Sequence, residues 1–177
     1  MDNKKIVIAV VIVLLLLIGL FAFHIIHICP FDAKATFTYN GHCYALYEPK
    51  DKGFSWYEAK RACESKGMHL ATFTSEEEWY MIKSHFDLPT DYAIWIGYTD
   101  KGEKQNHFVW ITGEKDGFEY WNSGEPNNIK NDETGETEDC AIILSKSRSN
   151  EALWNDYLCS KSKYLGNEKI GYICESE

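Results

Sequence analysis

Three short segments in the second half of the chain are rich in side chains that carry oxygen. They are Glu125-Pro126-Asn127, Glu138-Asp139-Cys140 and Trp154-Asn155-Asp156. Calcium binds roughly six to eight oxygen atoms from carboxylates, amides and carbonyls, and three carboxylates suit such a hard dication. The segments therefore predict a calcium site. Its candidate ligands are Glu125, Asn127, Glu138, Asn155 and Asp156.

Each segment taken alone is also consistent with solvated loop acids, since acidic side chains are mostly exposed. The positions of the cysteines favour the interpretation as a metal site. Glu138 lies two positions before Cys140 and Asp156 three before Cys159, so a bridge between these cysteines would bring two segments together. Pro126 would fix the third segment, and a cis bond there would turn both neighbouring side chains the same way.

Two helices and several strands are predicted to position these segments. Ser55-Trp56-Tyr57-Glu58 and Ser75-Glu76-Glu77-Glu78 match the capping box that begins a helix. The first helix would run from about Trp56 to Lys66 and stop at Gly67, and the second would end before Pro89. Short β-like runs follow at 93–98, 108–112, 141–144 and 169–174. The pattern predicts an α+β fold with long loops, and a polar loop such as 122–139 is usually functional or disordered.

The N-terminal region predicts a membrane anchor. Residues 6–23 contain no charge, and that length suits a bilayer. A cleaved signal peptide or a lipoprotein anchor on Cys29 are the alternatives, but no small-residue cleavage site follows the apolar run. With Lys4 and Lys5 held inside, we expect a cytoplasmic tail at 1–5, a transmembrane signal anchor at 6–28 and an extracytoplasmic domain at 29–177. This is the topology of a single-pass type II membrane protein.

All six cysteines follow the apolar run, as expected for a domain that folds in an oxidising compartment. Their spacing alone allows fifteen pairings. The net charge of the chain is −9, and the segment before Cys29 contributes +1 of it, so the remainder carries −10. Such a surface argues against a nucleic-acid partner.

From Cys29 to Cys174 the chain resembles a long-form C-type lectin domain. Trp95-Ile96-Gly97 resembles the core strand signature of that family, Glu125-Pro126-Asn127 its mannose-type motif and Trp154-Asn155-Asp156 its second calcium motif. The resemblance implies the C-type lectin fold and three disulfides. The implied pairs are Cys29 with Cys43, Cys63 with Cys174, and Cys140 with Cys159.

The resemblance also implies a role for the five candidate ligands. They would hold the sugar-binding Ca²⁺, with the backbone carbonyl of Asp156 as a sixth oxygen and two adjacent sugar hydroxyls completing the shell. The free carboxylate oxygens would accept hydrogen bonds from those hydroxyls, and the amides of Asn127 and Asn155 would donate to them. Metal binding here serves recognition, and no enzymatic reaction is expected.

Two departures from the family pattern stand out. Residues 128–136 form an apparent insertion, in which Glu133 or Glu136 competes with Glu138 for the role of third carboxylate. We favour Glu138 because a disulfide tethers its neighbour Cys140. A second calcium is implied only in part, because Lys104 stands where an acid is expected. Its candidate ligands are Asp100, Glu103, Asn128 and Asp139.

The leading hypothesis is a lectin for mannose, N-acetylglucosamine, fucose or glucose, whose weak single sites need clustering or a homo-oligomer for avidity. The second is a C-type lectin-like receptor for a protein, or an ice-binding variant, in which calcium is structural. A hydrolase is disfavoured, since no nucleophile and base can be paired. Trp95, Trp110 and Trp121 are predicted to be core residues rather than sugar-stacking platforms.

Overall fold

The computed structural model describes residues 29–114 and 118–176. The expected cytoplasmic tail and transmembrane anchor, residues 1–28, lie outside these ranges. Within the described part of the chain, no helix is both long enough and apolar enough to cross a membrane.

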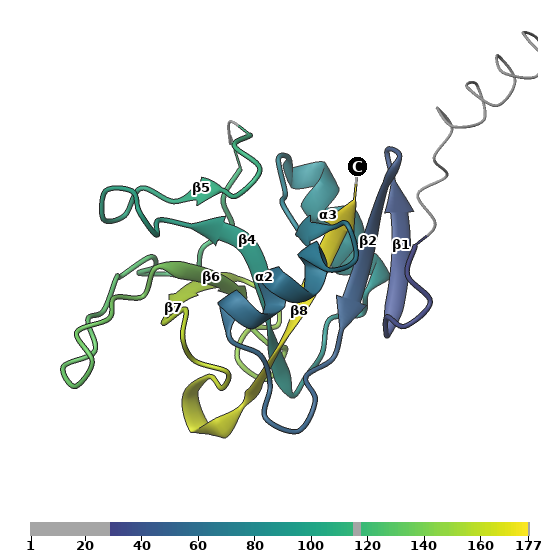
Figure 1. Ribbon diagram of the computed structural model, residues 1–177. Helices are drawn as coiled ribbons and strands as arrows, with labels where there is room; N and C mark the ends of the chain where they lie inside the picture. The colour runs from purple at the N-terminus through teal and green to yellow at the C-terminus, as the bar shows by residue number, and fades with distance from the viewer. Residues whose placement is uncertain (1–28, 115–117, 177) are drawn as a thin grey trace, which may run out of the picture.

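The described residues form two α-helices, one short 3₁₀ turn and eight strands, labelled as in Figure 1. The helical elements are α2 (Trp56–Glu64), α3 (Glu76–His85) and η1 (Leu165–Asn167). The strands are β1 (Ala35–Tyr39), β2 (His42–Tyr47), β3 (His69–Leu70), β4 (Tyr92–Thr99), β5 (Val109–Trp110), β6 (Cys140–Ile143), β7 (Trp154–Tyr157) and β8 (Lys169–Ser176). The predicted α+β class and its two helices are confirmed.

The strands make one mixed sheet in the order β1-β2-β8-β4-β6-β7, with β3 paired to β8 and β5 paired to β4. The β4–β8 pair is parallel and the other pairs are antiparallel. Figure 1 shows β1 and β2 on one side of the molecule and the long loops around β5, β6 and β7 on the opposite side. The candidate ligands lie in these loops and in β7, away from the first two strands.

The capping box at the start of α2 is confirmed. The Ser55 hydroxyl accepts a hydrogen bond from the Glu58 backbone N–H at 3.3 Å, and the Glu58 carboxylate accepts one from the Ser55 N–H at 2.9 Å. This backbone hydrogen bond is the main reason that the pKa of Glu58 falls to about 2. The indole of Trp56 then donates to the carbonyl of Ile96 at 2.9 Å, which ties α2 to β4. The helix ends two residues before the predicted Lys66.

The capping box predicted for α3 is only half right. The Ser75 hydroxyl accepts from the Glu78 N–H at 3.2 Å, but the Glu78 carboxylate bonds to the N–H of Thr74, at 2.7 Å, instead of that of Ser75. The reason is a competing partner, since the hydroxyl of the buried Tyr44 donates to the same carboxylate. Glu78 is therefore drawn into the protein interior, where it joins α3 to β2.

The tryptophans are packing residues, as predicted. Trp95 and Trp110 are fully buried, and Trp121 packs against the core from its edge. Trp154 is also fully buried, with its ring 5.6 Å from that of Trp79 and 5.7 Å from that of Trp110 in edge-on contacts. An aromatic cluster therefore supports the strand that carries two candidate ligands.

Three disulfides join distant parts of the chain, and they are the pairs that the family resemblance implies. The bridges are Cys29–Cys43, Cys63–Cys174 and Cys140–Cys159. The second joins α2 to β8, and the third joins the start of β6 to the residues just after β7. The described residues contain no free cysteine.

The cap of α2 leads to a first prediction. Replacing Ser55 with Ala removes the acceptor for the Glu58 N–H and should lower the free energy of unfolding by about 1 kcal/mol. Ser84→Ala is the matched control, because Ser84 is exposed and bonds only to a carbonyl within α3, so its change should stay within about 0.5 kcal/mol. Denaturant titration of the purified chain measures both values, and equal effects would contradict the capping role.

Candidate functional site

The β6–β7 hairpin positions three of the five predicted ligands. Asn155 and Asp156 lie in β7, opposite Ile142 and Ala141 of β6. Glu138 precedes β6 by two residues, and the Cys140–Cys159 bridge closes the hairpin at that end. The disulfide therefore fixes the acid before β6 relative to the acid within β7.

The segment that carries Glu125 and Asn127 is held onto β7 by backbone hydrogen bonds. The Trp154 N–H donates to the carbonyl of Tyr120, and the Asn122 N–H donates to the carbonyl of Trp154, both at 2.7 Å. The Glu125–Pro126 peptide bond is cis. The loop then turns over the end of β7, which brings the third motif to the other two.

Asp156 is the anchor of this loop. Its carboxylate is completely buried and accepts the backbone N–H of Asn127 at 3.2 Å on one oxygen and that of Asn128 at 2.7 Å on the other. Two backbone donors satisfy the buried charge. They also hold the motif loop against the strand.

Three carboxylates converge at this point. Burial raises the pKa of Glu125 to about 7, and the neighbouring Asp156 carboxylate adds to the effect. Burial likewise raises the pKa of Glu138 to about 7, followed by the negative charges of Asp156 and Glu125. Like charges in a partly buried site disfavour ionisation. No described Lys or Arg forms an ion pair with any of the three.

This electrostatic imbalance fits a bound dication. One oxygen of Glu125 is buried without a hydrogen-bond partner, which is costly unless another positive group binds it. Across the described ranges, no three His, Cys, Asp or Glu side chains are already grouped closely enough to hold a metal. The predicted ligand set also includes the amide oxygens of Asn127 and Asn155, and such oxygen-rich sets are typical of calcium.

The two predicted amide ligands are both present and partly engaged. The amide nitrogen of Asn155 donates to the carbonyl of Asp156 at 2.6 Å, so that carbonyl, the expected sixth ligand, already accepts one hydrogen bond. The amide oxygen of Asn127 accepts from the Ile129 N–H at 3.0 Å. A carbonyl oxygen has two lone pairs, so each oxygen keeps one for a cation.

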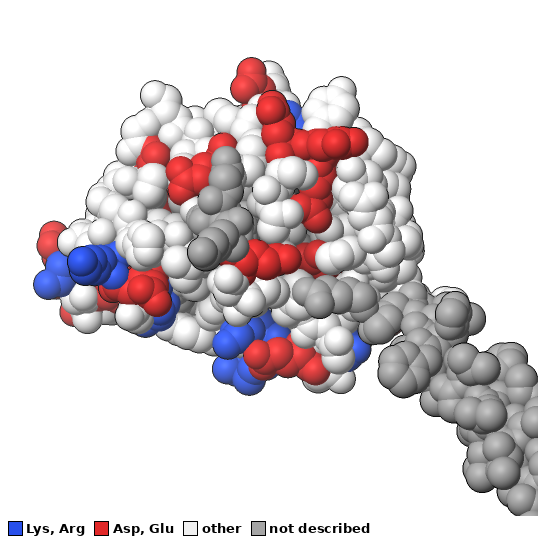
Figure 2. Space-filling view, turned by 90° about the horizontal axis from the view of Figure 1, so that it is seen from above, with Lys and Arg blue, Asp and Glu red and all other residues white. Residues whose placement is uncertain are grey.

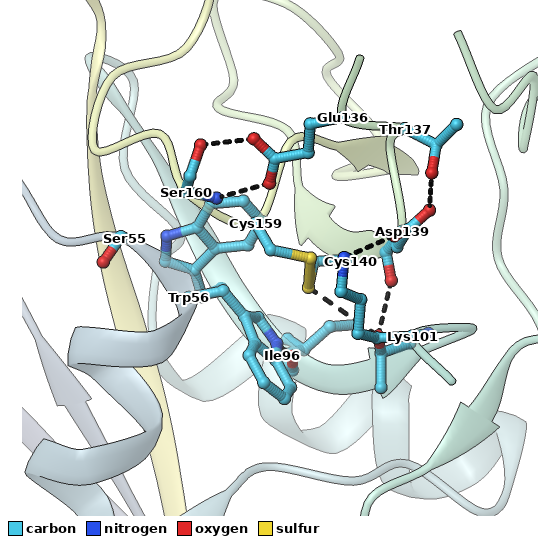
Figure 3. The surroundings of a disulfide bond; sticks show 12 residues. Ser55, Trp56, Ile96, Lys101, Glu136, Thr137, Asp139, Cys140, Cys159 and Ser160 are labelled. Carbon is cyan, nitrogen blue, oxygen red and sulfur yellow. Dashed lines mark hydrogen bonds and ion pairs between the residues drawn. A yellow bond between two sulfur atoms is a disulfide. The ribbon is translucent and has the colours of Figure 1, made fainter. Parts of the chain in front are cut away.

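The insertion at 128–136 is an ordered hairpin. Lys130 and Thr137 pair across it, and the side-chain oxygen of Asn131 accepts two backbone N–H groups at its tip. The Glu136 carboxylate accepts from the backbone N–H of Ser160 at 3.0 Å and from its hydroxyl (Figure 3). Glu133 is exposed. Of the three competing acids, Glu138 is therefore the one that lies beside Glu125 and Asp156.

The candidate residues for a second calcium are brought together only in part. The Asn128 amide donates to the Asp100 carboxylate at 3.0 Å, and each of these buried side chains keeps one oxygen without a partner. The Asp139 carboxylate pairs instead with Lys101 at 3.1 Å (Figure 3). Glu103 is exposed. A cavity of about 240 Å³ lies beside Asp100, Lys101 and Asp139.

Two tyrosines near the carboxylates were not identified as site residues from the sequence. Tyr157 directly follows Asp156, and its ring packs edge-on against that of Tyr164 with centroids 4.8 Å apart. Burial raises the pKa of Tyr157, and the charge of Glu138 adds to this effect. Burial also raises the pKa of Tyr164 to about 12, and the charges of Glu125 and Glu138 add to it. The position of Tyr157 directly after the Trp154-Asn155-Asp156 motif could have identified it from the sequence, whereas Tyr164 belongs to no motif.

The model of the lectin C-type domain family matches residues 52–175. The chain belongs to the C-type lectin family. Proteins with this domain generally bind carbohydrates, generally bind Ca²⁺ and are generally not enzymes.

Individual relatives agree with this assignment. Asialoglycoprotein receptor 2 of Rattus norvegicus is 34% identical over 125 residues, which are 70% of this chain and only 37% of that receptor. The carbohydrate-recognition domain of the mouse scavenger receptor C-type lectin is 30% identical, with a TM-score of 0.63 over 84% of this chain and 98% of that one. A calcium-independent type II antifreeze protein, 21% identical with a TM-score of 0.60 over 84% of this chain and 94% of that one, shares the fold alone.

Acidic side chains are more widespread than basic ones on one face of this lectin domain. Figure 2 shows Asp and Glu side chains across the middle and upper part of that face and at its left and lower edges, whereas Lys and Arg gather mainly at the left and lower edges. This distribution agrees with the net charge of −9. A polyanion would be repelled by such a face.

The raised pKa values lead to a second prediction. Because the folded site holds Glu125 and Glu138 near a pKa of 7 against an ordinary value of 4.5, it favours their neutral forms. The calcium-free protein should therefore lose stability as the pH rises from about 4.5 through 7. Binding of a cation requires the charged forms, so Ca²⁺ should release about one to two protons at pH 6 and few at pH 8.5.

Calorimetry at pH 6 in two buffers with different ionisation enthalpies measures this proton release. Glu151→Gln, which changes an exposed acid outside the site, should leave it unchanged. Calcium binding without proton release at pH 6 would contradict the proposed crowding of carboxylates.

Proposed function

We propose that this protein is a calcium-dependent lectin for sugars with the mannose arrangement of hydroxyls, namely mannose, N-acetylglucosamine, fucose and glucose. The observation that carries the proposal is the convergence of Glu125, Glu138 and Asp156, which lack a described cationic partner, beside the amides of Asn127 and Asn155. Membership of a family that generally binds carbohydrates supports it.

The roles follow from the chemistry of each group. Glu125, Asn127, Glu138, Asn155 and Asp156 would hold the ion. When bound, calcium would supply coordination positions for two adjacent sugar hydroxyls. The chain's own contribution is the pattern of hydrogen bonds around those hydroxyls, in which carboxylates accept and amide N–H groups donate. Asp156 also positions the motif loop through its two backbone hydrogen bonds.

We further propose that one calcium ion binds per domain. At the second cluster, Lys101 already supplies a positive charge to Asp139, and Glu103 is exposed. The buried oxygens without a partner at this cluster lie on Asp100 and Asn128, and calcium usually binds roughly six to eight oxygens.

The membrane anchor at 6–28 remains a proposal that rests on the uncharged run of residues 6–23. An anchored lectin with weak single sites gains avidity when copies gather in the plane of the membrane. Clustering or homo-oligomerisation of this chain is therefore part of the proposal.

The alternative function is recognition of a protein or of ice, with calcium in a structural role. The fold is compatible with it, since a calcium-independent antifreeze protein shares the fold. That likeness concerns the backbone alone. A glycan array with calcium and again with chelator distinguishes the alternatives, because only the lectin gives binding that chelation abolishes.

The third prediction reverses the hydrogen-bond pattern at the motif. Glu125→Gln combined with Asn127→Asp keeps one carboxylate and one amide, so calcium affinity should survive. The amide donor moves to position 125 and the carboxylate acceptor moves to position 127. Against mannose this leaves polar groups without a hydrogen-bond partner, and each unpaired group costs about 1–3 kcal/mol of binding free energy. Mannose affinity should fall roughly ten- to hundredfold or more, with some gain for galactose.

Competitive binding to immobilised mannose measures the change, and calorimetry follows calcium separately. The control exchanges an amide and an acid at exposed neighbours, Asn150→Asp with Glu151→Gln, at the same net charge. Undiminished mannose binding by the motif variant would favour the receptor hypothesis.

The fourth prediction concerns the third carboxylate. Glu138→Gln should weaken calcium binding at least about tenfold, because a buried charged ligand becomes neutral. Glu133→Gln, on the exposed hairpin, should leave both the affinity and a stoichiometry of one ion unchanged. If only Glu133→Gln impairs binding, the assignment of Glu138 is wrong.

A further inference from the structure

The loop between β7 and β8 is fixed from two sides. On one side, the Ser160 N–H and hydroxyl bond to Glu136 of the insertion hairpin. On the other, Arg148 pairs with Glu168 at 2.9 Å and donates to the carbonyl of Leu165. Residues 160–168, here called the β7–β8 loop, are therefore held between the hairpin that contains Asn128 and the turn that contains Arg148.

Tyr164 lies at the centre of this loop and its ring is clamped. One face of the ring receives the Arg148 guanidinium, 5.5 Å from the centroid, and the ring also packs edge-on against Tyr157 at 4.8 Å. The Tyr164 backbone N–H donates to the carbonyl of Glu168 at 2.6 Å. Only 8% of the residue is exposed. The orientation of the side chain is thus determined by the protein before any ligand binds.

The hydroxyl at the end of this clamped ring has no partner within the described residues. It forms no hydrogen bond there, and it is also absent from the polar atoms that are fully buried without a partner. It therefore keeps contact with solvent. A buried ring that ends in an accessible, unpaired hydroxyl is a polar group available to a ligand.

The position of this hydroxyl relates it to the candidate calcium site. Burial raises the pKa of Tyr164 to about 12, and the charges of Glu125 and Glu138 contribute. Its packing partner Tyr157 directly follows Asp156 in β7. The ring of Tyr164 therefore packs against the strand that carries Asn155 and Asp156.

We propose that the Tyr164 hydroxyl binds the glycan, and that the β7–β8 loop forms a second contact surface beside the two hydroxyls taken by the metal site. The proposal rests on the proposed lectin function. In chemical terms, Tyr164 can donate to a hydroxyl or ring oxygen, or accept from a hydroxyl, of the bound sugar or of the next unit in the chain. The preformed clamp makes this contact cheap, because little side-chain freedom is lost on binding.

The fifth prediction is that Tyr164→Phe weakens glycan binding about three- to tenfold, the effect of losing one neutral hydrogen bond. The variant keeps the ring and its packing. Calcium affinity and thermal stability should not change. The probes are methyl α-mannoside and α-linked mannobiose, titrated into the purified full-length chain in saturating calcium. A loss on both sugars places the contact on the calcium-bound unit, and a loss on mannobiose alone places it on the next.

Tyr172→Phe is the matched control. Tyr172 is as deeply buried, but its ring stacks on that of Tyr47 with centroids 4.9 Å apart. Its pKa is raised by burial and by the charge of Asp32, with no contribution from the site carboxylates. Its variant should bind both sugars as the unchanged chain does. Equal affinity of Tyr164→Phe and the unchanged chain for both probes would overturn the proposal. So would a parallel loss of calcium affinity, which would mean that Tyr164 acts through the metal ligands. If the unchanged chain binds neither sugar, the lectin function itself fails, which is a different result.

Discussion

The buried carboxylate of Asp156 is the interaction on which the site depends. It lies in a strand that the aromatic cluster fixes from below through Trp154, and its two oxygens hold the backbone of Asn127 and Asn128. Leaving these N–H groups and the charge unpaired in the interior would cost several kcal/mol. The position of the loop therefore depends on the strand, and the position of the strand depends on the core. A substitution in the core would shift the site residues even where no ligand residue is changed.

The sequence allowed much of the fold to be predicted, for identifiable reasons. Helix α2 followed from a capping box whose two residues bond to each other across one turn. The runs at 93–98, 141–144 and 169–174 overlap β4, β6 and β8, where burial on both faces gives continuous apolar runs. Strand β7 was not predicted, because Trp154-Asn155-Asp156 is a polar motif with one apolar residue. The capping box expected for α3 could not be predicted correctly, because the hydroxyl of Tyr44, far away in the sequence, donates a hydrogen bond to the Glu78 carboxylate.

The candidate site divides in the same way. Residue type and the neighbouring cysteines led us to prefer Glu138 over Glu133 and Glu136, because chain geometry near a disulfide is constrained, and this choice stays a prediction. The partners of the rejected acid could not be predicted, since the Glu136–Ser160 contact joins two loops with no shared motif. Tyr164 was missed for the same reason. The role proposed for it depends on packing against Tyr157 and Arg148, and these contacts form only in the folded chain.

The acidity of the site has a physical consequence beyond metal binding. Three carboxylates held together without a cation repel one another and oppose folding. Two interactions counteract this repulsion: backbone N–H groups donate hydrogen bonds to Asp156, and the disulfide keeps the two strands together. Under the proposed function, an ion that relieves the repulsion would also stabilise the loops that it binds. Loop order and metal occupancy would then be two aspects of one equilibrium. Because the β7–β8 loop is bonded to the insertion hairpin through Glu136 and Ser160, that equilibrium would extend to the surface that presents Tyr164.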